Sequence, residues 1–487
     1  MKIQSGGDSR EGYPLARYVE SIGLPGGLIR HSAMLLLITG LITPCGRAAG
    51  QGAGRTLSFA EALSLAEERN ERILAADAAV DRARSDRRVA QGRRFPDVNL
   101  TGRTTRIDDE IVIDLDPIRQ VMLGLHPGVP SAAIPPFQAR IQRQAFNNAG
   151  LSATMPVFTG GRLRAGVRAA DAAVDAAEAG QRSMVGEVAT ELAQRYFGLQ
   201  LAIQNRATRQ ASRESLGRHV ERARSLERNG QIARAERLRA EVALAEADRD
   251  VQQAESDEQL ARLALAATLA MDVAIMPETP LFKVSPLAPV DSFKAAARDR
   301  NPILARLASE QARARQGIDA TRGEFLPSLG LFAQRELYTH DLTITQPVWA
   351  AGVQLSLPLF QGGQRFARLA GARAQARQVE LLRIRAQRDI DLLVEQRYRQ
   401  VEQARIQLTS LEATRTLAEE SLRAQQLAFA AGLATSLDVV DAEQALARVQ
   451  LGMFKALHDA DVSLAALLES IGQPSRLPEY INAERAR

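Results

Sequence analysis

The sequence predicts a mainly α-helical protein with a smaller β portion, built as two tandem copies of one unit: two strands followed by a long helical hairpin. A glycine interrupts a long helical pattern twice, and each time the same Ala-Glu-x-Ala-Leu-Ala ending follows. Three landmarks that keep one offset of 202 residues indicate an internal duplication. The landmark pairs are Met155–Gly161 with Leu357–Gly363, Tyr196 with Tyr398, and Gly230 with Gly432.

The amino-acid content suits long packed helices better than a compact enzyme. Only 4% of the 487 residues are aromatic, whereas alanine, leucine, arginine and glutamine dominate. The formal net charge is +5, and basic residues are interleaved with acids along the predicted helices. This balance gives no support to nucleic-acid binding.

No site for chemistry or for a cofactor is indicated. Cys45 is the only cysteine and falls in or beside the predicted leader, so disulfides and thiolate metal sites are excluded from the mature chain. The five histidines are scattered, and no nucleophile triad, phosphate loop or zinc spacing is present. We therefore expect no catalytic residues, no cofactor and no metal.

Residues 1–49 have the order of a secretory signal, and the true start of the chain is open. Arg30 precedes an apolar run over 33–42, and small residues follow it. That run is about ten residues long, whereas a spanning helix needs ~20. Cys45 invites comparison with a lipoprotein cleavage box, but Pro44 stands where that box has a small residue, which disfavours lipidation.

Residues 50–272 form the first predicted repeat. It begins with one helix over 57–93, with Ser58 as its cap. Two alternating strands then flank a loop at 106–147 that is rich in acids and proline. A helix from Arg162 to the glycine at 230 and a returning helix over 232–271 complete the repeat as a hairpin with its tip at Gly230.

The second repeat, 291–472, follows the same scheme. Its predicted parts are one helix over 291–322, a strand from 327, a strand over 353–360, and helices reaching 430 and covering 435–471, with the hairpin tip at Gly432. A linker at 273–290 precedes it, and a polar tail at 473–487 ends the chain. The turns from strand to helix are predicted at Pro156, Phe158, Gly160 and Gly161, and at Pro358, Phe360, Gly362 and Gly363.

Four strands cannot close a barrel, and a half-apolar sheet with open edges is not viable in lipid. Several copies must therefore pool their strands. Transmembrane barrels begin at about eight strands, so two copies would make a filled barrel and three would make one of twelve strands with a lumen.

These features resemble the TolC-like outer membrane efflux proteins over about residues 55–472. The strand-ending Pro-x-Phe-x-Gly-Gly, the duplication and the tip motif Gly-x-x-x-Ser-x-Asp-Val-x-Asp-Ala carry the resemblance. It implies a homotrimer with a twelve-stranded outer membrane barrel, four strands per chain, continued by an α-helical tunnel across the periplasm. The channel would be a passive conduit in a tripartite efflux or type I secretion system.

The resemblance also implies partners and sites. The tunnel's lower end would meet a periplasmic adaptor and an inner membrane pump, with docking at the tips. The implied positions are Asp438 and Asp441 at an acidic constriction, Glu236 at the acidic position of the first hairpin, and Gly230, Gly432, Leu433 and Thr435 at the tips. At two gate positions the chain departs from TolC itself, with Phe429 for an aromatic hydroxyl and Ala434 for a base.

Simpler interpretations stay open. Asp438 stands three residues after Thr435, so it is also placed to complete a capping box worth ~1 kcal/mol. Asp441 lies one turn on and fits solvated surface equally well. A soluble periplasmic coiled-coil adaptor or scaffold would share the leader and the hairpins, but it would not need paired strands around a long loop. An enzyme is a weaker alternative, because no titratable cluster converges.

Overall fold

The computed structural model describes residues 55–485, apart from 274, 342 and 344–345. The predicted leader at 1–49, with Cys45, lies outside the described residues. Within them, helices predominate, which confirms the predicted fold class. No helix in this part of the chain combines the length and the apolar content needed to cross a bilayer.

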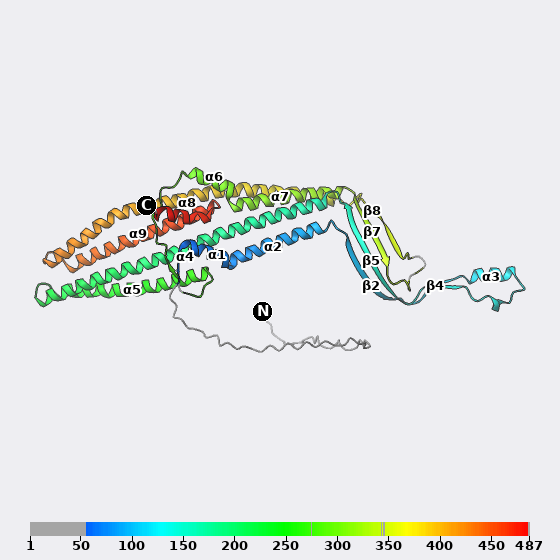
Figure 1. The fold of residues 1–487 in the computed structure, drawn as a ribbon, viewed down its shortest axis with the longest axis horizontal. Coiled ribbons are helices and arrows are strands. Elements are labelled where there is room, and N and C mark those ends of the chain that lie inside the picture. The colour runs from blue at the N-terminus through cyan, green and yellow to red at the C-terminus, as the bar shows by residue number, and fades with distance from the viewer. Residues whose placement is uncertain (1–54, 274, 342, 344–345, 486–487) are drawn as a thin grey trace, which may run out of the picture. The chain divides into compact units, whose positions relative to one another are not determined.

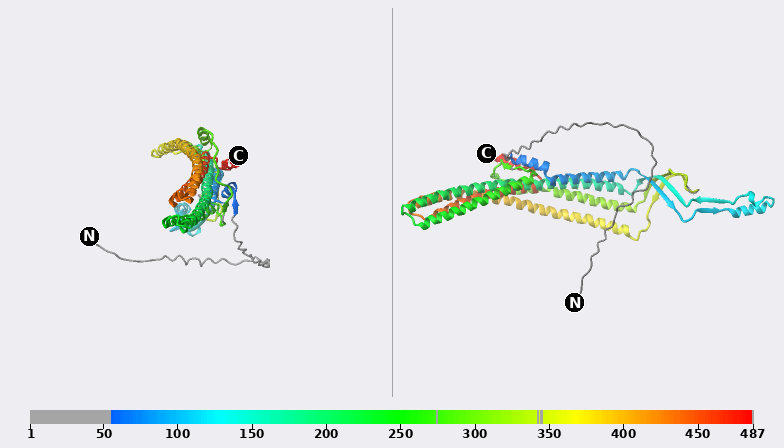
Figure 2. Two further views of the ribbon diagram at one scale, coloured as in Figure 1. Left: turned by 90° about the vertical axis from the view of Figure 1, so that its left-hand side faces the viewer. Right: turned by 90° about the horizontal axis from the view of Figure 1, so that it is seen from below.

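Two long helical hairpins lie side by side and are the largest elements of the structure (Figures 1 and 2). Helices α4 and α8 each have 67 residues, and α5 and α9 each have 35, so the hairpins match as the duplication requires. At 1.5 Å per residue, the longer helices extend about 100 Å. Their bounds are Arg162–Arg228 (α4), Arg234–Thr268 (α5), Gln364–Ala430 (α8) and Ser436–Ser470 (α9).

Each predicted single helix before a sheet is in fact two helices. An asparagine caps the second helix of each pair: the Oδ1 atom of Asn70 accepts from Arg72 N, and that of Asn301 accepts from Ile303 N. The same asparagines donate Nδ2–H to Thr268 O and Ser470 O, at the ends of α5 and α9. The four helices are α1 (Phe59–Arg69), α2 (Glu71–Gly92), α6 (Val290–Arg300) and α7 (Pro302–Arg322).

Four antiparallel strands form one sheet at the end of the helices opposite the hairpin tips (Figure 1). The order is β2-β5-β7-β8, so β2 and β8 are its outer strands. Strand β8 ends at Ser356, four residues before the predicted end. The bounds are Asp97–Arg106 (β2), Ala145–Phe158 (β5), Ser328–Glu336 (β7) and Trp349–Ser356 (β8).

The strand-to-helix turns need left-handed backbone. Gly160 and Gly362, which correspond in the two repeats, have φ of 62° and 57°. A Cβ at Gly160 would lie 2.4 Å from the carbonyl oxygen of Gly323, which begins the short 3-10 helix η2 (Gly323–Phe325), whereas a Cβ at Gly362 would meet nothing within 4 Å. Pro156 and Phe158, predicted in the turn, lie within β5 at a register shift. Pro358 and Phe360 follow β8.

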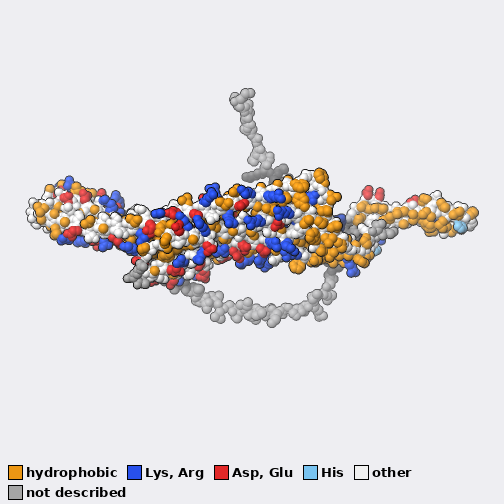
Figure 3. All heavy atoms as spheres, turned by 90° about the horizontal axis from the view of Figure 1, so that it is seen from above, with side chains coloured by type: hydrophobic (Ala, Val, Ile, Leu, Met, Phe, Trp, Pro, Cys, Tyr) orange, Lys and Arg blue, Asp and Glu red, His pale blue; other side chains and the backbone are white. Residues whose placement is uncertain are grey.

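The predicted loop at 106–147 has structure of its own. It contains a second antiparallel pair, β3 with β4, and a short helix between them. Hydrophobic side chains are prominent on this extension in Figure 3, and Ile118, Val121 and Leu125 of the helix are 55%, 64% and 72% exposed. Its elements are β3 (Ile111–Asp114), α3 (Asp116–Leu125), η1 (Ser131–Ala133) and β4 (Gln138–Gln142).

The predicted linker at 273–290 is part of the core. Its strand β6 (Ile275–Pro277) pairs in parallel with β1 (Arg55–Leu57). The hydroxyl of Tyr196 donates to Leu57 O at 2.7 Å and accepts from Thr279 N at 2.8 Å, which ties both strands to α4. The burial of this hydroxyl raises the pKa of Tyr196.

The same segment is held to α9 by a buried acid. Asp461 is fully buried and accepts from Phe282 N at 3.2 Å, and burial raises its pKa well above the usual value. The cause is desolvation, which disfavours the charged form of the Asp461 carboxyl. The predicted polar tail also packs: η3 (Pro474–Arg476) leads into α10 (Leu477–Arg485), where Leu477 and Ile481 are buried.

Candidate functional site

The candidate site is the pair of hairpin tips, where α4 turns into α5 and α8 into α9. Gly230 and Gly432 have φ of 72° and 74°, the left-handed conformation that ends a helix at low cost only for glycine. The following N–H groups reach back into the helices: Gln231 N donates to Leu226 O and Leu433 N donates to Ala428 O. The Leu433 side chain is 84% exposed at the second tip.

Thr435 and Asp438 form the capping box that begins α9. The Asp438 carboxylate accepts from both Thr435 N and Thr435 Oγ1 at 2.7 Å, and Asp438 N donates to Thr435 Oγ1 at 3.3 Å. These hydrogen bonds lower the pKa of Asp438. Asp438 therefore caps α9, as the simpler interpretation predicted. The capping hydrogen bonds also favour the ionised form of this exposed carboxylate.

Glu236 does not point into open solvent. It lies in the first turn of α5, and its Oε2 accepts from Ser436 N at 2.8 Å, so it joins the first hairpin to the start of α9. Its other oxygen accepts from Arg239 at 3.1 Å. The side chain is 20% exposed, and the predicted acidic position therefore makes a contact between the two hairpins.

A histidine that the sequence did not single out lies behind this contact. His219 of α4 is 7% exposed, with its Nε2 3.3 Å from Ser436 Oγ and its ring 4.6 Å from that of Phe429. Burial and the nearby Arg222 lower the pKa of His219 to about 4. Phe429, which replaces an aromatic hydroxyl, is 1% exposed and packs in an apolar cluster that includes Val220, Leu422 and Val439.

One helical turn further from the tip, a second polar contact joins the hairpins. Ser215 Oγ on α4 donates to Glu443 Oε2 on α9 at 2.7 Å. Glu443 is 5% exposed, and burial raises the pKa of its carboxyl. This glutamate belongs to the Ala-Glu-x-Ala-Leu-Ala ending that marked the duplication, but the sequence gave no sign of its burial.

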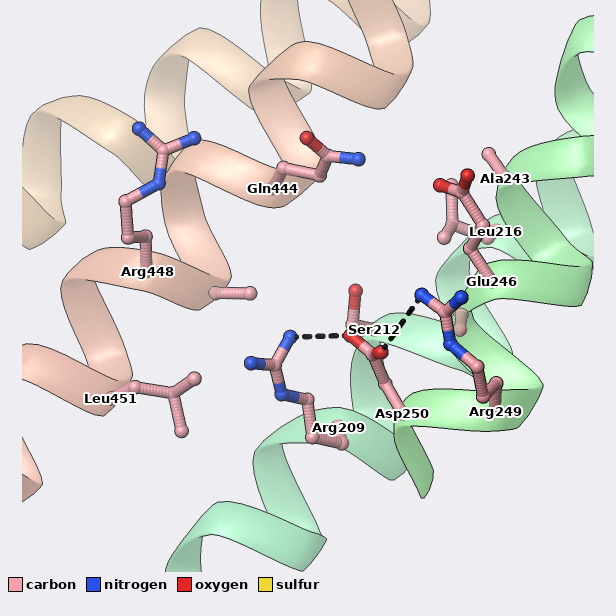
Figure 4. A pocket seen from close by; sticks show the side chains of 12 residues that line it. Arg209, Ser212, Leu216, Ala243, Glu246, Arg249, Asp250, Gln444, Arg448 and Leu451 are labelled. Carbon is pink, nitrogen blue, oxygen red and sulfur yellow. Dashed lines mark hydrogen bonds and ion pairs between the residues drawn. The ribbon is translucent and has the colours of Figure 1, made fainter. Parts of the chain in front are cut away.

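A groove between α5 and α9 runs away from the tips as two adjoining cavities. Asp441 lines the cavity nearer the tips, of about 540 Å³, beside Leu238, Val242 and Leu437. Figure 4 shows the cavity further from the tips, of about 310 Å³. There Arg209 is paired with Asp250 at 2.9 Å, and Gln444 and Arg448 of α9 form the facing wall. Asp438 does not line either cavity.

The polar side chains at the tips and along the groove make hydrogen bonds between helices of the two hairpins. In the described part of the chain, no three His, Cys, Asp or Glu side chains are grouped so as to hold a metal ion. The buried titratable groups near the tips, His219 and Glu443, each face a serine hydroxyl across a helix interface. Their arrangement suits holding or releasing the hairpins.

Comparison with known proteins gives one family. A model described as "outer membrane efflux protein" matches residues 62–270 and 295–473. The alkaline protease secretion protein AprF of Pseudomonas aeruginosa is 30% identical over 214 residues, which are 41% of this chain and 43% of AprF. The match thus spans less than half the length of that relative. The outer membrane efflux protein BepC of Brucella suis is 25% identical over 66% of this chain and 72% of BepC.

Solved structures agree at the level of the fold. The outer membrane protein VceC of Vibrio cholerae superposes with a TM-score of 0.69 at 19% identity, covering 85% of this chain and 96% of that one. CusC gives a TM-score of 0.71 at 17% identity, with 85% and 91% covered.

Proposed function

This chain belongs to the outer membrane efflux protein family, and from this premise we propose that it is the outer membrane channel of a tripartite efflux or type I secretion system. It lies in the outer membrane with a periplasmic extension, as its family does. The observation that carries the proposal is the continuation of a four-stranded sheet into two long hairpins. We assign the chain no catalytic step; an adaptor at the tips and an inner membrane pump would supply selection and energy.

The sheet supports assembly with further copies. In the described part of the chain, β2 and β8 each pair along one edge, and an open edge in lipid leaves backbone N–H and C=O groups unsatisfied. Closure by other copies of the same chain removes both edges. Because four strands per chain give twelve in a trimer, three copies are the smallest assembly that leaves a lumen.

The duplication predicts the register of this pairing between copies. Each residue of β2 corresponds to the residue of β7 whose number is 231 higher, and each residue of β5 to the residue of β8 whose number is 202 higher. The pair Asp97 and Thr154 in the first repeat thus corresponds to the pair Ser328 and Ser356 in the second. The contact between the repeats, β5 with β7, places Thr154 opposite Phe332. By the same correspondence, the pairing of β5 with β7 has its counterpart in a pairing between copies, of β8 in one copy with β2 in the next.

In this pairing of β8 with β2 of the next copy, Ser356 takes the place of Thr154 and Thr101 takes the place of Phe332. Ser356 should therefore lie opposite Thr101 of the neighbouring copy. We expect Thr101→Cys with Ser356→Cys, in a Cys45→Ser background, to form disulfides between chains, because opposed strand residues lie about 5 Å apart. Oxidised membranes run on a non-reducing gel should give a ladder that ends at three chains.

Thr105→Cys is the matched control, since it faces the same side of β2 and lies about 13 Å further along it. It should not cross-link with Ser356→Cys. A ladder that ends at two chains would contradict the trimer, and equal cross-linking of both pairs would contradict the register.

The extension at 106–147 should face the cell exterior, because it lies beyond the sheet at the end opposite the tips. An epitope tag inserted at Gly128 should be labelled by antibody on intact cells, and one inserted at Gly230 only after permeabilisation. If labelling at Gly128 also requires permeabilisation, the proposed orientation is wrong.

A further inference from the structure

We propose that the apolar face of α3 binds the same face of α3 in neighbouring copies of this chain, so that the extensions form a helix bundle outside the membrane. We call the four side chains of this face the α3 stripe: Ile118, Val121, Met122 and Leu125. The inference rests on the proposed assembly of three copies. It adds a second contact between copies, beyond the sheet.

The α3 stripe has the spacing of a helix face that packs on another helix. At 100° per residue, its four side chains fall within an arc of about 100° around the helix. All four are exposed, and the extension that carries them shows mainly hydrophobic side chains in Figure 3. Arg119 and Leu123, on another side of α3, are the partly buried residues. The α3 stripe is therefore not the face that holds α3 to its own extension.

The charges of the extension argue against a lipid surface as the occupant. Residues 115–137 include one acid and one arginine, and these two pair: Arg119 Nε lies 2.7 Å from Asp116 Oδ1. Arg119 Nη1 also donates to Ile134 O at 2.8 Å. Helices that lie on a membrane instead carry many lysines or arginines on their polar face. The exposed Asp108 and Asp109 would also repel an anionic lipid surface.

Neighbouring copies of the chain are the apolar partners within reach. The extension continues from β2 and β5, and β2 is the strand proposed to pair with β8 of the next copy. Twelve strands about 4.8 Å apart, tilted by about 40°, enclose a barrel about 24 Å across.

The length of the extension matches that width. The ten residues of α3 extend about 15 Å and the four of β3 about 13 Å. Three extensions on one rim can therefore meet, and tethering gives each α3 stripe a local concentration of roughly millimolar for the others. A free partner from solution would need a far higher affinity to compete.

The order of the stripe suits a bundle around a three-fold axis. Ile118 and Leu125 are seven residues apart, so they take equivalent positions of a heptad, and Val121 and Met122 fill the layer between them. In such a bundle the same residue of each helix lies in one layer around the axis. Equivalent side chains of the α3 stripe should then contact each other.

Leu125→Cys in a Cys45→Ser background tests this contact. Oxidation of intact cells should convert much of the protein to a dimer on a non-reducing gel, because one cysteine per chain can join two of three copies. Gln120→Cys is the matched control, since Gln120 is exposed on the same helix but lies about 140° around it from Leu125. Leu125→Cys should give several times as much dimer as Gln120→Cys.

The cross-link between Thr101→Cys and Ser356→Cys separates the two possible failures. If that pair gives no ladder, the proposed assembly is wrong. If the ladder forms and Leu125→Cys gives no more dimer than Gln120→Cys, the α3 stripe does not bind other copies. Protection of Leu125→Cys from a water-soluble maleimide without dimer would indicate lipid, and a bismaleimide product with a different protein would indicate another partner. Either result overturns the proposal.

A second measurement does not depend on cysteine chemistry. Ile118→Ser with Leu125→Ser should lower the temperature at which the assembled protein dissociates in detergent, followed by native electrophoresis. Both side chains are exposed within one chain, so the urea unfolding of the single chain should not change. Gln120→Ser is the control and should dissociate like the unmodified protein. An unchanged dissociation temperature in the double variant contradicts the bundle.

Discussion

Replacing Gly160 by alanine should destabilise the folded chain by roughly 2–6 kcal/mol, the sum expected for left-handed strain and for overpacking. The backbone there has φ of 62°, and the new Cβ would lie 2.4 Å from the carbonyl oxygen of Gly323. Neither residue can move away freely, since Gly160 joins β5 to α4 and Gly323 joins α7 to η2. Urea unfolding of the detergent-solubilised protein, followed by far-UV circular dichroism, measures the change.

Gly161 provides the control for backbone strain alone. Its φ is 84°, but a Cβ there would meet nothing within 4 Å. Gly161→Ala should therefore cost only the left-handed strain of about 1–3 kcal/mol. Equal losses of stability in the two variants would show that the approach of Gly323 is unimportant.

The second repeat should respond differently. Gly362 corresponds to Gly160, and Gly92 corresponds to Gly323. Within one chain, a Cβ added at Gly362 or at Gly92 would meet nothing within 4 Å. If neighbouring copies repeat the contact between the repeats, Gly362→Ala should weaken assembly more than it weakens the chain. Blue native electrophoresis would then show a larger loss of trimer for Gly362→Ala than for Gly161→Ala.

If Asp438 and Asp441 line the tunnel mouth, as we propose, removing their charges should abolish a preference for cations there. In the proposed trimer, a three-fold axis would repeat Asp438 and Asp441 three times each and put up to six carboxylates around one opening. Carboxylates brought close together in such a ring would repel one another, which favours bound cations. Hydrogen bonds from Thr435 lower the pKa of Asp438, so this residue keeps its charge to a lower pH than an ordinary aspartate.

Asp438→Asn with Asp441→Asn tests the charge while keeping oxygen atoms that can accept the capping hydrogen bonds. In planar bilayers, the double variant should lose cation selectivity and block by divalent or trivalent cations. Thr435→Ala is the complementary control, because it weakens the cap and leaves both charges. Unchanged selectivity and block in the double variant would make Asp438 a cap and Asp441 ordinary surface.

The parts of the fold that the sequence predicted depend on local rules. Ser58 with Glu61 and Thr435 with Asp438 are capping boxes of residues three apart, and the long helices follow from the absence of breakers. The helix break at Asn70 was missed because its amide also binds Thr268 O, 198 residues away. Strand β6 was missed because three residues whose partner lies far away in the sequence give no periodic signal.

The candidate site divides in the same way. Glycine and the acid six residues later located both tips, and Asp438 caps as its spacing predicted. Glu236 stays a predicted gate residue, but its contact with Ser436 of α9 could not be predicted, because it depends on how the two hairpins pack. A single histidine on a helix has no distinctive pattern, so only the packing of Phe429 over His219 reveals that residue.

The pairing of β1 with β6 also imposes an order on biogenesis. Phe59 N donates to Thr279 Oγ1 over a separation of 220 residues, so Phe59 cannot find this partner until the whole first hairpin has been synthesised. At roughly 5–20 residues per second of synthesis, that wait exceeds about ten seconds. During it, the side chains of Leu57 and Phe59, each 1% exposed in the folded chain, lack the partners that bury them.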